Sequence, residues 1–161
     1  MDVFSPEKRS DIMRRVRSVD TTPEVKVRSM LHRLGFRFRL HRKDLPGKPD
    51  IVLPKHSTVI FVHGCFWHRH PGCSRATTPA THQSYWFAKF ERTVIRDFDN
   101  QSVLSSWGWN VIIVWECELR NPDALLHRLK NEITDPKAVY RQDRENQRLA
   151  AEKAGFYGEK E

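Results

Sequence analysis

The sequence has no long uninterrupted hydrophobic run and few cysteines. No apolar stretch approaches the roughly 20 residues that a membrane-spanning helix needs, and no basic-then-apolar signal peptide opens the chain. The 161 residues include only three cysteines, an odd number that argues against a complete disulfide framework and for a reducing compartment. Internal repeats and low-complexity tracts are also missing. We therefore expect a cytoplasmic protein, neither membrane-bound nor built on disulfides.

Acidic residues are outnumbered by basic ones. Lys and Arg total 28 against 20 Asp and Glu, which gives a formal net charge of +8. This balance favours a polyanionic partner, because each neutralised phosphate releases counterions. The same charge also fits a soluble basic protein with no nucleic-acid role, so charge alone does not decide between the two. The length fits one domain with a real core.

The order of predicted elements indicates an α/β domain with helices around a mixed sheet. Ser5 and Pro6 are typical of a helix start, and apolar spacing predicts further helices over 22–34, 84–105 and 121–133. Strands are predicted over 36–40, 50–53, 58–62 and 109–115, with 50–53 and 58–62 paired as a hairpin. We expect the last strand, the most apolar, at the centre of the sheet.

Residues 63–73 read HGCFWHRHPGC and concentrate possible metal ligands in one loop. Cys65, His70 and Cys73 have zinc-like spacing, and Cys117 follows the last predicted strand. Four such ligands suit a closed, structural zinc site. His68 competes with His70 for the fourth position, although the Pro71-Gly72 turn favours His70. The alternative interpretation is a set of ordinary buried thiols and solvent-exposed histidines.

A possible catalytic group lies at the ends of the predicted hairpin strands. Asp50 begins one strand, and His63 and His68 follow the other. A carboxylate at a strand end suits Mg²⁺ at a phosphate, and an imidazole beside it suits proton transfer to or from water. Each residue alone is more typical of a structural role, Asp50 as a turn or cap residue and His63 as a satisfied histidine. Their combination in a basic chain is a stronger indication of an enzyme.

Three motifs together resemble the very short patch repair (Vsr) endonucleases: Leu45–Asp50 (LPGKPD), Phe61–His68 (FVHGCFWH) and Val114–Cys117 (VWEC). The resemblance covers roughly residues 5–133. It implies a restriction-endonuclease-like α/β fold, a central mixed sheet flanked by helices, with a structural zinc site. It also implies an enzyme that nicks DNA on the 5′ side of the thymine in a T:G mismatch left by deamination of 5-methylcytosine.

The resemblance also implies roles for individual residues. Asp50 binds Mg²⁺, with the backbone carbonyl of Val62 completing the coordination. His68 is the general base, His63 assists at the scissile phosphate, and Glu24 supports the centre. The implied zinc ligands agree with the spacing argument: Cys65, His70, Cys73 and Cys117.

For DNA recognition, the resemblance implies that Phe66, Trp67 and Trp86 wedge into the duplex beside the mismatch, with Met13 approaching from the other groove. A mismatched step is easier to unstack than a matched one, which favours insertion of aromatic side chains there. Core packing is the alternative for Phe66 and Trp67. Arginines are candidate phosphate contacts that also fit a solvated surface: Arg14, Arg15, Arg17, Arg37 and Arg39.

The predicted organisation has three parts: a basic DNA-contacting arm (1–19), an endonuclease core with the zinc site (20–133) and a charged tail (134–161). One departure from the wider superfamily is clear, because the 59–63 strand lacks its usual acid and lysine. The expected partners are mismatched double-stranded DNA and MutL-type repair proteins, for a monomer in a bacterial cytoplasm. Two other functions remain open: a restriction-type nuclease on matched DNA, and a non-catalytic zinc-stabilised DNA-binding module.

Overall fold

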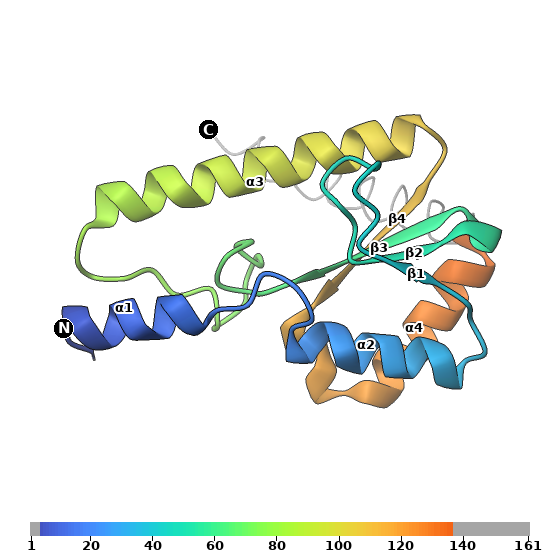
Figure 1. Cartoon of the computed structure of the whole chain (residues 1–161), viewed down its shortest axis with the longest axis horizontal. Helices are drawn as coiled ribbons and strands as arrows, with labels where there is room; N and C mark the ends of the chain where they lie inside the picture. Colours follow the sequence, from blue (N-terminus) through green and yellow to red (C-terminus); the bar gives the residue numbers. More distant parts are fainter. Residues whose placement is uncertain (1–3, 137–161) are drawn as a thin grey trace, which may run out of the picture.

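The computed structural model describes residues 4–136, in which helices surround one four-stranded sheet (Figure 1). The predicted charged tail lies outside the described residues from position 137 onward. The elements follow the order α1 (Pro6–Arg15), α2 (Thr22–Arg33), β1 (Arg39–Leu40), β2 (Ile51–Leu53), η1 (Pro54–His56), β3 (Thr58–His63), α3 (Gln83–Ser106), β4 (Asn110–Trp115), η2 (Glu116–Arg120) and α4 (Pro122–Thr134).

The sheet is mixed, as predicted, with strand order β1-β2-β3-β4. β2 pairs antiparallel with both β1 and β3, while β3 and β4 run parallel and are joined through α3. The expectation that the 109–115 strand is central was wrong, because β4 lies at the edge of the sheet. Its apolar sequence has another cause: helices cover both of its faces. The predicted 36–40 strand is reduced to two residues.

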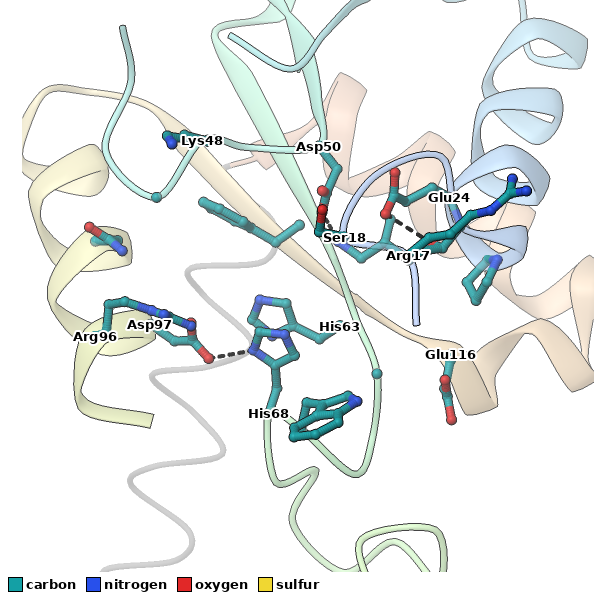
Figure 2. Close-up of a pocket in the computed structure, with 18 of the residues that line it drawn as sticks. Arg17, Ser18, Glu24, Lys48, Asp50, His63, His68, Arg96, Asp97 and Glu116 are labelled. Atoms are coloured by element: carbon teal, nitrogen blue, oxygen red, sulfur yellow. Dashed lines mark hydrogen bonds and ion pairs between the residues drawn. The ribbon is translucent and has the colours of Figure 1, made fainter. Parts of the chain in front are cut away.

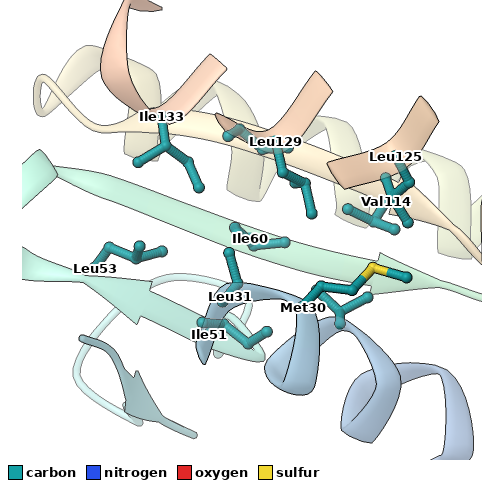
Figure 3. Close-up of a cluster of buried hydrophobic side chains, with 11 residues drawn as sticks. Met30, Leu31, Ile51, Leu53, Ile60, Val114, Leu125, Leu129 and Ile133 are labelled. Atoms are coloured by element: carbon teal, nitrogen blue, oxygen red, sulfur yellow. The ribbon is translucent and has the colours of Figure 1, made fainter. Parts of the chain in front are cut away.

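Alternate strand residues supply two cores, one on each face of the sheet. α2 and α4 cover the first face, where Leu31, Ile60 and Leu129 are fully buried (Figure 3). The carboxyl-terminal part of α3 covers the other face, where Leu104 packs with Val59. Neighbouring residues of one strand therefore enter different cores, which fixes the register of the hairpin.

Two helices extend beyond the sheet (Figure 1). α1 begins as predicted, with the Ser5 side chain accepting a hydrogen bond from the Lys8 amide, but none of its described residues is buried. The amino-terminal half of α3 also runs past the sheet and buries Trp86 and Phe90 there. Within residues 4–136, no helix is both long and apolar enough to cross a membrane.

Candidate active site and metal centre

A cavity of about 620 Å³ opens where the start of β2 meets the end of β3. Asp50 immediately precedes β2, His63 ends β3, and His68 follows in the next loop; all three line this cavity (Figure 2). The hairpin therefore brings together side chains that are up to 18 positions apart in sequence. Glu24, from the first turn of α2, lines the same space.

Asp50 is held by the strand that pairs with its own. Its Oδ2 accepts a hydrogen bond of 2.7 Å from the amide of Val62. Burial raises the pKa of Asp50 to about 6, the Val62 amide opposes this, and the nearby Glu24 carboxylate adds to the rise. A partly desolvated carboxylate with a second carboxylate nearby favours a bound cation, and oxygen donors suit Mg²⁺. The residues present therefore fit the expected hard cation.

Glu24 is itself firmly bonded to protein groups. Its Oε1 accepts from the Thr21 hydroxyl at 2.9 Å, and its Oε2 accepts from the Asp20 amide at 3.0 Å. The Arg28 guanidinium also bonds Oε2 at 3.2 Å. Because both oxygens are occupied and the side chain is buried, Glu24 has a fixed position. This arrangement suits a residue that supports a nearby metal site without binding the ion directly.

His68 forms a dyad with an aspartate of α3. Its Nδ1 lies 2.5 Å from Oδ2 of Asp97. A carboxylate at Nδ1 holds the proton on that nitrogen and leaves Nε2 as the basic one. Asp97 reaches His68 from the opposite wall of the cavity (Figure 2). The pair has the geometry of an oriented general base.

His63 lies beneath His68 and is kept neutral. The two imidazole rings are stacked, with centroids 3.8 Å apart and planes 7° apart. Burial, together with a smaller effect of the neighbouring His68, lowers the pKa of His63 to about 3. A neutral His63 provides a hydrogen-bonding ring and a flat support for His68, without a positive charge of its own.

The four predicted zinc ligands meet at one point. The ligand atoms of Cys65, His70, Cys73 and Cys117 all lie within 4.8 Å of one another. His70 Nδ1 is 3.6 Å from the sulfur of Cys65 and 3.3 Å from that of Cys117. A tetrahedral zinc with usual bond lengths would separate sulfur and nitrogen ligands by about 3.5 Å. The donor set therefore fits zinc in both chemistry and spacing.

The electrostatics of the thiols also fit a cation. Burial raises the pKa of Cys65 to about 12, so a thiolate there needs a neighbouring positive charge. Backbone amides, chiefly that of Arg75, lower the pKa of Cys73 and so favour its thiolate. His68 is directed to Asp97, and His70 to the cysteines, which separates the two histidines that the sequence left in competition.

The three predicted wedge aromatics form one cluster at the amino-terminal end of α3. Phe66 contacts Trp67, Trp86 and Phe90 with ring centroids 5.1, 5.7 and 5.3 Å apart. Phe66 and Trp67 are half-buried, while Trp86 is buried. Trp67 also lines the cavity that holds Asp50, His63 and His68. The cluster is separate from both cores of the sheet, so Phe66 and Trp67 are not core residues.

The helical part of the predicted arm lies apart from these groups. Met13, Arg14 and Arg15 are exposed on α1, and none of them lines the cavity that holds Asp50. Arg17 and Ser18, just beyond the helix, do line it. The arm thus leads directly from the exposed helix into the cavity wall.

Several residues of the cavity were not predicted from the sequence. The most important is Asp97, which lies eleven positions after Trp86 and seven before Leu104, on the buried side of α3. A carboxylate on the same helix face as buried apolar residues indicates a candidate functional site. The other unpredicted residues that line the cavity include Lys48, Arg96, Asn100 and Glu116.

The structure and sequence are similar to known endonucleases. The catalytic domain of the homing endonuclease I-Bth0305I has the same fold, with a TM-score of 0.50 and 21% identity over 71% of this chain and 97% of that domain. Residues 1–75 match the family model "DNA mismatch endonuclease Vsr".

Two bacterial relatives extend the similarity across most of the chain. The type II nicking enzyme V.XorIIP of Xanthomonas oryzae pv. oryzae is 52% identical over 84% of this chain and 98% of its own length. The DNA mismatch endonuclease Vsr of Escherichia coli is 42% identical over 77% of this chain and 79% of its own. The chain belongs to the Vsr family of DNA endonucleases.

Proposed function

We propose that this endonuclease nicks one strand of DNA on the 5′ side of the thymine in a T:G mismatch produced by deamination of 5-methylcytosine. The observation that carries this proposal is that Trp67 belongs to two neighbouring groups. Its ring belongs to the aromatic cluster and lines the cavity that holds Asp50, His63 and His68. A base step opened by the aromatics would therefore lie beside the groups that act on phosphate.

The proposed catalytic cation is Mg²⁺, held by Asp50 and the backbone carbonyl of Val62. When bound, such an ion stabilises negative charge on the phosphate and polarises water. Glu24 supports the centre from α2, where its own hydrogen bonds keep it fixed. The proposed zinc ion is structural, because Cys65, His70, Cys73 and Cys117 would fill a tetrahedral site and leave no open position.

The proposed chemistry is hydrolysis of one phosphodiester bond. His68 accepts a proton from the attacking water at Nε2, while Asp97 stabilises the imidazolium through Nδ1. The new phosphorus–oxygen bond forms as the bond to the 3′ oxygen breaks, and that oxygen leaves as a hydroxyl after taking up a proton. The products are a 5′-phosphate and a 3′-hydroxyl. His63, neutral and stacked on His68, supports the base and faces the phosphate.

Recognition is assigned to the aromatic cluster and the arm. Phe66 and Trp67 would enter the duplex beside the mismatch, where unstacking costs least, and the buried Trp86 would support both rings from within the cluster. Met13 would approach from the other groove, with Arg14 and Arg15 at the phosphates. The printed name of the Escherichia coli relative, a DNA mismatch endonuclease, supports a mismatch substrate, and the name of the Xanthomonas relative, a nicking enzyme, supports cutting of one strand.

The wider setting follows from the same proposal. We assign the fold to the restriction-endonuclease-like class, the substrate to nucleoid DNA in a bacterial cytoplasm, and the active form to a monomer, since cutting one strand needs one catalytic centre. Coupling to MutL-type repair proteins belongs to this setting.

The test is a nicking assay on otherwise identical duplexes that are matched or contain one T:G or A:C mismatch. We expect Mg²⁺-dependent cutting of the T:G duplex alone, no cutting without Mg²⁺, and none by Asp50→Asn. Equal cutting of matched and T:G duplexes would replace the proposal with the restriction-type alternative. If Asp50→Asn were as active as the native protein, Asp50 would not be a ligand of the catalytic metal.

A further inference from the structure

The side chain of Arg69 ties together the loop that holds the aromatics. Its Nη1 donates to the carbonyls of Phe66 at 3.4 Å and Thr77 at 2.9 Å. Its Nη2 donates to the carbonyl of Ala76 at 3.0 Å and the hydroxyl of Thr78 at 3.1 Å. Four oxygens from two separate segments thus converge on one guanidinium, whose planar fork suits several directed hydrogen bonds.

The same guanidinium lies over the aromatic cluster. Its central carbon is 4.0 Å from the ring centroid of Phe90, within the range of a cation–π contact. Phe90 in turn packs against Phe66 and Trp86, at 5.3 and 5.6 Å between centroids. Arg69 therefore contacts both the backbone of Phe66 and the ring that supports its side chain.

Two observations argue against a contact between Arg69 and DNA phosphate. Each of the two terminal nitrogens has two N–H bonds, and the four internal acceptors match all of them. The side chain is also half-buried rather than extended into solvent. These four acceptors are uncharged oxygens, so the arrangement organises backbone rather than pairing charges.

The backbone of Arg69 is also unusual. Its φ of +55° places it in the left-handed region, which non-glycine residues adopt at a cost of order 1 kcal/mol. This turn separates His68, which bonds Asp97, from His70, which lies with the cysteines. The left-handed backbone at Arg69 turns the chain between these two sites, and the Arg69 side chain lies against the aromatic cluster.

We infer that Arg69 is a positioning residue that fixes the aromatic cluster in its DNA-ready arrangement before DNA binds. The inference rests on the proposed role of Phe66 and Trp67 as the wedge. A wedge that is already ordered loses less conformational entropy on insertion, so more of its stacking energy goes into opening the mismatch. Lysine keeps the charge but presents a point donor in place of the fork, so it cannot hold four oxygens at once.

The test compares Arg69→Lys with the native protein and with Arg33→Lys, an exposed arginine at the end of α2. A T:G duplex with 2-aminopurine beside the mismatch reports unstacking by its fluorescence, and the same duplex without the probe gives kcat and KM for nicking. We expect Arg69→Lys to keep its zinc and a cooperative melting transition, at a somewhat lower melting temperature. Its fluorescence rise should shrink, and its kcat on T:G should fall about tenfold with little change in KM. Arg33→Lys should behave as the native protein does.

Phe66→Ala provides the reference for loss of the wedge. Native fluorescence and kcat in Arg69→Lys, together with a defect in Phe66→Ala, would overturn the inference about Arg69 alone. Native behaviour of Phe66→Ala would overturn the wedge itself, and with it the proposed mode of recognition. Loss of zinc or of cooperative melting in Arg69→Lys would also overturn the inference, because it would assign Arg69 to the stability of the loop.

Discussion

His68 and Asp97 form a hydrogen bond of 2.5 Å across the cavity, although they are 29 positions apart in the sequence. One comes from the loop after β3 and the other from the middle of α3. This bond fixes the tautomer of His68 and directs its Nε2 away from the carboxylate. The orientation of His68, the proposed general base, thus depends on the packing of α3 against the 63–73 loop.

Asp97→Asn should strongly reduce the nicking rate while leaving binding nearly intact. The amide cannot stabilise the imidazolium and favours the wrong tautomer, so we expect a loss of about 10²-fold or more in single-turnover rate. Asp99→Asn is the matched control, because Asp99 is an exposed acid two positions away on the same helix. Similar rates for the two variants would show that Asp97 has no role in the mechanism.

His70→Asn should lose zinc, and His68→Asn should keep it. The Nδ1 of His70 lies with the cysteine sulfurs, whereas that of His68 is bonded to Asp97. Zinc content, measured by atomic emission on purified protein, should be about one equivalent for the native chain and for His68→Asn. A reversal of the two results would exchange the proposed ligands.

Asp50→Asn should stabilise the metal-free protein at alkaline pH while abolishing nicking. The pKa of Asp50 is raised from 3.8 to about 6 in the folded state, so stability falls as the pH rises from about 4 to about 6, and the full loss remains above pH 6. The gain from the substitution should reach about 3 kcal/mol above pH 6 and vanish below about pH 4. Urea unfolding at several pH values, with Asp99→Asn as the control, measures this difference. A variant less stable than the native protein at pH 8 would contradict the expected sign.

His63→Asn should remove a pH-dependent loss of stability that occurs in acid, whereas that of Asp50 occurs as the pH rises. The pKa of His63 is lowered to about 3 by burial, so below pH 6.5 the unfolded chain binds a proton that the native state excludes. The native protein therefore loses stability as the pH falls toward 3, and its difference from His63→Asn should shrink by about 2 kcal/mol between pH 7 and pH 5. Urea unfolding of both proteins measures the effect. A difference that stays constant over this range would show that His63 does not titrate as expected.

Local sequence was sufficient for the features that depend on local chemistry. The spacing of Cys65, His70 and Cys73 predicted a metal-like cluster, and the structure brings these residues together with Cys117. The hairpin of β2 and β3 was also predicted correctly, because each apolar run has the length of a short buried strand.

Features that depend on long-range packing were beyond local patterns. The edge position of β4 follows from which strands pair, and an apolar run covered by helices on both faces resembles a central strand. Asp97 was missed because its partner comes from a loop on the far side of the cavity. The separation of His68 from His70 depends on the left-handed turn at Arg69, which no spacing rule predicts.

The most direct test of the central claim is to map the nick on a T:G duplex whose two strands are labelled separately, in the presence of Mg²⁺. We expect a single cut in the thymine strand, immediately 5′ of the mismatched thymine, and an uncut guanine strand. Cutting of both strands, or the same cut in a matched duplex of identical sequence, would contradict it.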